Sequence, residues 1–256
     1  MKRRKNALIL LAGGTGSRMG AGVPKQFMEL RGKPLIWYSL NAVQRSDLID
    51  ECILVSGKDQ IRTAREITDR YGFDKVSHIV TGGAERYLSV VNAVLALMEK
   101  NGSCECAEGA PEIILIHDGA RPFLTDEIIQ RCLDGVEDTG GCAAAVPSKD
   151  TVKIADESGY VTQEPLRRNV WLMQTPQVFR SDILCRACRG ILDGGVGESG
   201  HFADTSAITD DVCMVRMITG ADVKLVMGDY ENIKVTTPDD LIIADKILEA
   251  QIGHFT

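Results

Sequence analysis

Short apolar runs alternate with longer amphipathic stretches along most of this 256-residue chain. The amphipathic stretches predict helices at residues 58–72, 85–100, 125–138 and 237–253, the last of which opens with a threonine, a proline and two acids. Parallel strands need crossover connections of this kind. The alternation therefore predicts an α/β fold: a three-layer α/β/α, Rossmann-like arrangement whose twisted, mostly parallel sheet has helices on both faces. The apolar runs predict its strands at residues 7–12, 51–56, 77–80, 113–117, 142–147 and 223–228.

One segment interrupts the alternation. Residues 148–180 are rich in β-forming and charged residues and show no clear helix. We interpret them as an arm that leaves the main sheet and is either solvated at its tip or paired with a second subunit. Residues 101–112 are a polar loop, and no stretch has the composition of an interdomain linker. The chain is therefore expected to form a single domain over residues 1–256.

Composition narrows the choice of partners and compartment. The net charge of −7 argues against nucleic acid or a membrane surface as the main partner. The first apolar run is six residues long, shorter than the apolar part of a signal peptide, and no run approaches the ~18 residues of a membrane span. The eight cysteines are scattered, without zinc-binding spacing to one another or to the histidines. We expect reduced thiols and a cytoplasmic protein.

A glycine-rich loop follows the first predicted strand, in residues 11–27, LAGGTGSRMGAGVPKQF. In an open α/β sheet this loop lies at the edge where ligands bind, and its glycines allow backbone N–H groups to surround an anion. A dinucleotide fingerprint from Gly14 would need glycine where Met19 stands, and the Gly-Lys-Ser/Thr of a P-loop does not follow the strand. Arg18 and Lys25 supply the cations that a polyphosphate needs. The alternative is a tight turn with two solvated basic residues.

Several stretches together resemble one family. LAGGTGSRMG and PKQF are similar to the signature of nucleotidyltransferases that join sugar or polyol phosphates to nucleoside triphosphates. Residues 82–90, 116–123, 146–153, 168–179, 209–211 and 232–241 narrow the resemblance to the 2-C-methyl-D-erythritol 4-phosphate cytidylyltransferases of the non-mevalonate isoprenoid pathway. The resemblance runs from about residue 7 to residue 248. The related ribitol-5-phosphate cytidylyltransferases share much of it, although residues 147–151, PSKDT, favour the methylerythritol family.

The resemblance implies a nucleotidyltransferase fold, CTP and a sugar or polyol phosphate as substrates, Mg²⁺ as cofactor and a homodimer. The acceptor phosphate would attack the α-phosphorus of CTP and release pyrophosphate. Because the second pKa of a phosphate monoester is about 6, the acceptor is already largely ionised at pH 7 and needs no general base. Catalysis would consist of positioning and stabilisation of charge.

The resemblance also assigns residues to roles. Catalysis is expected from Arg18, Lys25 and Lys234. The acceptor is expected to contact Thr151, Arg168, Thr209 and Arg121, where Thr151 and Arg168 belong to the arm and can act on a neighbouring subunit. The family usually has an acid where Arg167 stands, and we assign the role to Arg168 because it directly precedes Asn169. The nucleotide is expected to contact Ala12, Gly13, Gly14, Thr15, Gly16, Gly82, Gly83, Arg86, Ser89, Asp118 and Ala120.

Three roles are open to Asp118, which ends the predicted strand at residues 113–117. It could contact the ribose or the acceptor, act on Mg²⁺ directly or through water, or cap the following turn. Mg²⁺ keeps several waters and favours phosphate oxygens, so a dedicated protein cage is not expected. The neighbouring His117 is expected to be structural. Two rival functions are a non-catalytic nucleotide-binding module, which would be expected to lack the Arg18 and Lys25 pair, and a nicotinamide-dependent reductase, which Met19 disfavours.

The expected role of Lys25 can be tested directly. Lys25→Ala should fold like the parent protein but lose most turnover, since removing one fixed charge at a phosphoryl-transfer site costs about two to three orders of magnitude in rate. Circular dichroism and a pyrophosphate-release assay measure the two properties. Near-normal turnover in a well-folded variant would refute the role.

Overall fold

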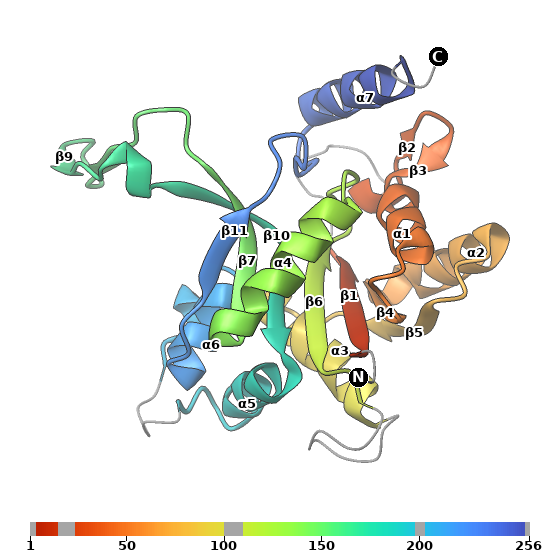
Figure 1. Ribbon diagram of the computed structural model, residues 1–256, viewed down its shortest axis with the longest axis horizontal. Helices are drawn as coiled ribbons and strands as arrows, with labels where there is room; N and C mark the ends of the chain where they lie inside the picture. The colour runs from red at the N-terminus through yellow and green to blue at the C-terminus, as the bar shows by residue number, and fades with distance from the viewer. Residues whose placement is uncertain (1–3, 15–23, 100–109, 198–202, 254–256) are drawn as a thin grey trace.

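The computed structural model describes residues 4–14, 24–99, 110–197 and 203–253 (Figure 1). Its centre is a seven-stranded sheet in the order β11-β7-β10-β6-β1-β4-β5. Strand β10 is antiparallel to both of its neighbours, β6 and β7, and all the other neighbouring strands are parallel. The predicted α/β fold with a mostly parallel sheet is thus confirmed. The strands are β1 (Asn6–Ala12), β4 (Glu51–Ser56), β5 (Val76–Thr81), β6 (Ile113–Asp118), β7 (Gly141–Pro147), β10 (Trp171–Arg180) and β11 (Lys224–Met227).

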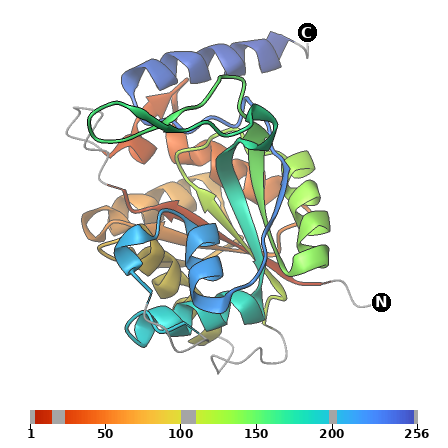
Figure 2. The same ribbon diagram turned by 90° about the vertical axis from the view of Figure 1, so that its left-hand side faces the viewer.

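Helices cover both faces of this sheet, as Figures 1 and 2 show. Alternate residues of β1 point to opposite sides, so Ala7 and Ile9 lie in one core and Leu8 and Leu10 in the other. The first core includes buried residues of α3 (Arg86–Glu99), α5 (Ser181–Leu192) and α6 (Asp211–Thr219). The second includes buried residues of α1 (Leu35–Arg45), α2 (Ile61–Tyr71) and α4 (Asp126–Thr139). This double burial explains why the strands read as continuous apolar runs.

The last helix, α7 (Pro238–Gly253), belongs to a third, smaller core. That core combines Leu30, Leu35, Phe123, Val235 and Ala244 and lies beside the carboxyl ends of the strands, where the short strands β2 (Glu29–Leu30) and β3 (Lys33–Pro34) also lie (Figure 1). It therefore anchors the chain on both sides of the edge where ligands bind in α/β sheets.

The predicted strands and helices are present, with boundaries that shift by a few residues. The prediction left out α1, α5 and α6. Helices α1 and α5 begin at Leu35 and Ser181 without a side-chain cap, so the usual start signal is missing. Helix α6 has nine residues and is capped by Asp210. Helix α4 begins as expected, because the Thr125 side chain accepts a hydrogen bond from the backbone N–H of Ile128.

The segment at residues 148–180 has two parts, and only the first of them leaves the main sheet as predicted. Its end, β10, returns to the middle of the main sheet. Residues 148–170, called the arm below, project from the body and carry β8 (Ile154–Ala155) and β9 (Val161–Gln163) (Figure 1). The arm exposes large apolar side chains, including Tyr160 at 74% and Leu166 at 59%. In the part of the chain that the structure describes, no helix combines the length and the apolar composition needed to cross a membrane.

Candidate active site

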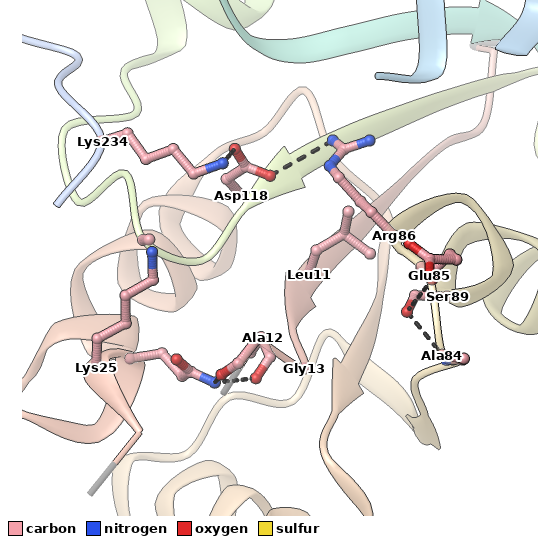
Figure 3. A pocket seen from close by; sticks show the side chains of 14 residues that line it. Leu11, Ala12, Gly13, Lys25, Ala84, Glu85, Arg86, Ser89, Asp118 and Lys234 are labelled. Carbon is pink, nitrogen blue, oxygen red and sulfur yellow. Dashed lines mark hydrogen bonds and ion pairs between the residues drawn. The ribbon is translucent and has the colours of Figure 1, made fainter. Parts of the chain in front are cut away.

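A cavity of about 540 Å³ lies at the carboxyl ends of β1 and β6 (Figure 3). Its cations come from separate parts of the chain: Lys25 from the short helix η2 (Lys25–Phe27), Arg86 from the start of α3, and Lys234 from the segment between β11 and α7. Asp118, the last residue of β6, lies between Arg86 and Lys234. The lining consists of Leu11, Ala12, Gly13, Gly14, Lys25, Gln26, Gly83, Ala84, Glu85, Arg86, Ser89, Asp118, Ala120 and Lys234.

Asp118 is the electrostatic centre of this cavity. Its carboxylate lies 2.8 Å from Lys234 Nζ, 3.4 Å from a terminal nitrogen of Arg86 and 3.8 Å from Nε of Arg121. Burial alone would raise the pKa of Asp118, but the charges of Arg86, Lys234 and Arg121 outweigh it and hold the pKa well below its usual range. Asp118 is therefore a carboxylate at any physiological pH.

Arg86 is held by two carboxylates. One terminal nitrogen lies 2.6 Å from Oδ1 of Asp211, a fully buried residue at the start of α6, and the other faces Asp118. Burial raises the pKa of Asp211, although the charge of Arg86 opposes the shift. The guanidinium therefore has a fixed position between β6 and α6, with 29% of the side chain exposed to the cavity side.

A hydrogen-bond chain behind the cavity fixes the turn that follows Asp118. Nε2 of the buried His117 lies 3.1 Å from the carbonyl oxygen of Arg121, so this nitrogen carries the proton. The Thr175 hydroxyl then donates to Nδ1 of His117 and accepts from the backbone N–H of Asp118. The imidazole of His117, the Thr175 hydroxyl and the N–H of Asp118 are thus all paired, and the side chain of Asp118 is aimed at the cavity.

Backbone forms the opposite side of the cavity. The Gln26 amide donates to the carbonyl oxygens of Ala12 and Gly14, which fixes the course of the chain after β1. The Ser89 hydroxyl accepts from the N–H of Gly83, 3.0 Å away. A Cβ on Gly83 would lie 2.4 Å from Cβ of Leu88, so no larger residue fits without movement of the chain. This wall offers backbone groups to a ligand.

The structure brings most of the sequence-predicted site residues to one place. Ala12, Gly13, Gly14, Lys25, Gly83, Arg86, Ser89, Asp118, Ala120 and Lys234 line the cavity. Gly82 is adjacent to Gly83, and its N–H donates to the carbonyl oxygen of Ser56. Thr15, Gly16 and Arg18 lie outside the described residues.

The four residues predicted to contact the acceptor substrate do not line the cavity. Arg121 is buried behind Asp118 and donates to the carbonyl oxygens of Asn232 and Met173. Thr151 and Arg168 are exposed on the arm, and Thr209 is exposed before α6. The arm points away from the body, as the view in Figure 1 shows.

Sequence reasoning missed Asp211 and Gln26. Both lie in stretches that carry the family resemblance, residues 209–211 and 24–27. In these stretches the resemblance gave a role only to Thr209 and Lys25. Neither contact is local in sequence: Asp211 binds Arg86 across 125 positions, and Gln26 reaches back to the end of β1. The signal that could have found Asp211 is its place in the TDD stretch, residues 209–211, which carries the resemblance.

Comparisons with known proteins agree with one another. The family model of IspD, 2-C-methyl-D-erythritol 4-phosphate cytidylyltransferase, matches residues 6–250. A Clostridium botulinum (strain 657 / Type Ba4) protein of that name is 41% identical, over 96% of this chain and 98% of its own length. The Geobacter metallireducens protein is 39% identical, over 95% and 97%. The crystal structure of 4-diphosphocytidyl-2C-methyl-D-erythritol synthase from Anaerococcus prevotii has a TM-score of 0.77 and 29% identity, and the match covers 96% of this chain and 99% of that one.

His117 predicts a pH dependence of stability. Burial lowers its pKa from 6.5 to about 4, so between these values the unfolded chain binds a proton that the folded protein does not. Above pH 6.5 His117 is neutral in both states and does not reduce the free energy of unfolding. As the pH decreases toward 4, the free energy of unfolding falls by about 3 kcal/mol in total. Urea unfolding at several pH values should show this loss in the parent protein and a flatter profile in His117→Gln. Parallel profiles for the two proteins would contradict the assignment.

Proposed function

The chain belongs to the 2-C-methyl-D-erythritol 4-phosphate cytidylyltransferase family, and we propose that the cavity around Asp118 is where it transfers the cytidylyl group of CTP to 2-C-methyl-D-erythritol 4-phosphate. The products are 4-diphosphocytidyl-2-C-methyl-D-erythritol and pyrophosphate, in the non-mevalonate isoprenoid pathway. The observation that carries the assignment of the site is the gathering of Lys25, Arg86 and Lys234 around one glycine-lined cavity at the carboxyl edge of the sheet.

The reaction needs position and charge rather than a base. An oxygen of the acceptor phosphate attacks the α-phosphorus of CTP, and the bond to the bridging oxygen of pyrophosphate breaks. Since the acceptor is already ionised, no proton has to be removed. Lys25, together with Arg18 from outside the described residues, is proposed to hold the triphosphate and to stabilise the charge that develops on the α-phosphoryl oxygens.

The nucleotide and the acceptor are proposed to occupy opposite sides of Asp118. On the nucleotide side, Gly13, Gly83 and Ser89 are proposed to offer backbone groups and a hydroxyl to the pyrimidine. On the acceptor side, Lys234 faces the phosphate. Arg121 supports that side by binding the carbonyl oxygen of Asn232, two residues before Lys234.

Mg²⁺ is proposed as the cofactor. The described residues contain no group of three or more histidine, cysteine or carboxylate side chains that could hold a metal ion. Both oxygens of Asp118 already face cations, Arg86 on one and Lys234 and Arg121 on the other. The residues present thus fit an ion held mainly by triphosphate oxygens and water, with Asp118 as the nearby carboxylate that acts through water. When bound, Mg²⁺ supplies neutralisation of phosphate charge.

The arm supports a homodimer. It exposes Tyr160, Val161 and Leu166, although large apolar side chains at a projecting tip are unfavourable in water. We therefore propose that the arm packs against a second copy of the chain and that Arg168 and Thr151 contribute to the partner's acceptor site. The thiols of Cys52, Cys132, Cys142 and Cys213 form no disulfide, which supports a cytoplasmic location.

Pyrophosphate release tests the function and the choice of acceptor. We expect turnover with CTP and 2-C-methyl-D-erythritol 4-phosphate, and at least about tenfold less with ribitol 5-phosphate or with ATP, GTP or UTP, because a missing or misplaced contact costs roughly 1.4 kcal/mol or more. The coupled assay is run with each of the four nucleotides and both acceptors. A preference for ribitol 5-phosphate would favour the alternative acceptor, and release of pyrophosphate from CTP without any acceptor would contradict the transfer reaction.

Mixed dimers test the proposed contribution of the arm. Lys25→Ala and Arg168→Ala, each of low activity alone, should together recover about a quarter of parental turnover after unfolding and joint refolding. A hybrid dimer then holds one site with both an intact Lys25 and an intact partner's arm. The control is joint refolding of Lys25→Ala with Lys234→Ala, which places both defects in the body of the subunit. This mixture should recover no activity, because an intact site would form only if Lys234 also acted across the interface. If the test mixture, like the control, recovers no activity from well-folded subunits, the arm does not act on the neighbouring site.

A further inference from the structure

The middle of β10 contains a short sequence whose role the site description leaves open: residues 174–177, QTPQ. These residues are buried, yet three of the four side chains are polar. The pairing of β10 with β7 shifts register between Met173 and Gln177, so the regular ladder is interrupted here. The side chains of Gln174 and Gln177 bind backbone groups of two different segments, one on each side of the cavity.

Gln174 binds the segment that carries Lys234. Its amide nitrogen donates to the carbonyl oxygen of Asp229, 2.7 Å away, and its amide oxygen accepts from the N–H of Asp229 and from Nδ2 of Asn232. Gln174 is 6% exposed and Asn232 is fully buried. Loss of the amide would remove three hydrogen bonds, two to the backbone of the exposed Asp229 and one to the buried Asn232, and so release one attachment of the segment.

The Lys234 segment is also held on its other side. Asn232 donates to the carbonyl oxygen of Thr175 and accepts from Arg121, and the N–H of Val235 donates to the carbonyl oxygen of Ala120. Lys234 lies between these two attachments and reaches Asp118 at 2.8 Å. The position of its ammonium group therefore depends on the bonds that hold this segment, three of which are made by Gln174.

Gln177 binds the start of α6 instead. Its amide oxygen accepts from the N–H groups of Asp211 and Val212, and its amide nitrogen donates to the Asp210 carboxylate. These two N–H groups lie in the first turn of the helix, where they have no partner within the helix. Asp211 in turn holds Arg86 through a 2.6 Å contact. The position of Arg86 therefore depends on Gln177.

We propose that Gln174 and Gln177 are positioning residues that set the two sides of the site separately. Gln174 places Lys234 for the acceptor phosphate, and Gln177 places Arg86, through Asp211, for the nucleotide. The inference rests on the proposed function, because it takes the roles of Lys234 and Arg86 from there. It adds that one strand, inserted antiparallel in the sheet, holds both sides and that each side can be disturbed without the other.

The test compares Gln174→Met with Gln177→Met. The two substitutions remove the same amide from the same strand at similar burial, 6% and 2% exposure, so each is a control for the other. Gln174→Met should raise the KM for 2-C-methyl-D-erythritol 4-phosphate about tenfold and change the KM for CTP less than about twofold, since a displaced contact costs at least this much. Gln177→Met should show the reverse pattern.

A second variant protects the test against misfolding. A Cβ on Gly228 would lie 2.3 Å from the amide oxygen of Gln174, so Gly228→Ala displaces this amide without removing it. It should reproduce the rise in acceptor KM. Circular dichroism and thermal unfolding establish that each variant is folded. General destabilisation would not produce opposite patterns in the two KM values.

Lys234→Ala and Arg86→Ala serve as references for the two sides. If Lys234→Ala raises the acceptor KM while Gln174→Met and Gly228→Ala leave it unchanged, the inference is overturned and the proposed function stands. Equal effects of both glutamine variants on both KM values also overturn it. If Lys234→Ala leaves the acceptor KM unchanged, the proposed role of Lys234 is wrong and the inference falls with it.

Discussion

The site depends on one buried negative charge. Arg86, Lys234 and Arg121 come from three parts of the chain and would repel one another at these distances without a counter-ion. Asp118 supplies it from the end of the central strand β6, and its low pKa keeps the charge in place. The three cations can therefore be gathered before any phosphate arrives. Removal of Asp118 would leave Arg86 with Asp211 alone and would deprive Lys234 and Arg121 of this counter-ion, and uncompensated charge at a partly buried position is costly.

The charge on Asp118 requires a rigid support, and the sheet provides it. Strand β6 is paired on both sides, with β1 and with β10, and the turn after it is closed by the chain of Thr175, His117 and Arg121. A neutral histidine is needed there, because Nδ1 must accept while Nε2 donates to a carbonyl oxygen. The burial that keeps His117 neutral is thus part of what aims Asp118 at the cavity.

The sequence predicted the fold well where the signals are local. The apolar runs and capped helices required only neighbouring residues, and the glycine-rich end of β1 lies at the ligand-binding edge as α/β topology demands. The antiparallel position of β10 was not predicted, because strand order depends on contacts between distant segments. Helix α5 was missed since it begins directly after β10, and its N-cap residue, Arg180, makes no side-chain cap.

The same distinction applies to the candidate site. Lys25, Asp118 and the glycines follow strand ends and could be named from their position. Arg86 and Lys234 depended on the family resemblance, and their common partner Asp118 became evident only from the structure. Asp211 and Gln177 act through contacts 33 or more positions apart in sequence, which no periodicity encodes. The arm residues Thr151 and Arg168 keep the role that the resemblance implied, as a proposal.

Charge balance links these parts to the proposed cofactor. The cations in and behind the cavity wall are Lys25, Arg86, Arg121 and Lys234. The acids are Glu85, Asp118 and Asp211, so the described side chains leave little excess positive charge. The acceptor phosphate alone carries about two negative charges at pH 7, and the triphosphate of CTP adds more. Binding both substrates therefore needs positive charge from elsewhere. The proposed function contains three such sources: Arg18, a metal ion that arrives with the nucleotide, and an arginine from a partner's arm. The incomplete charge balance within one subunit is therefore itself an argument for Mg²⁺ and for the dimer.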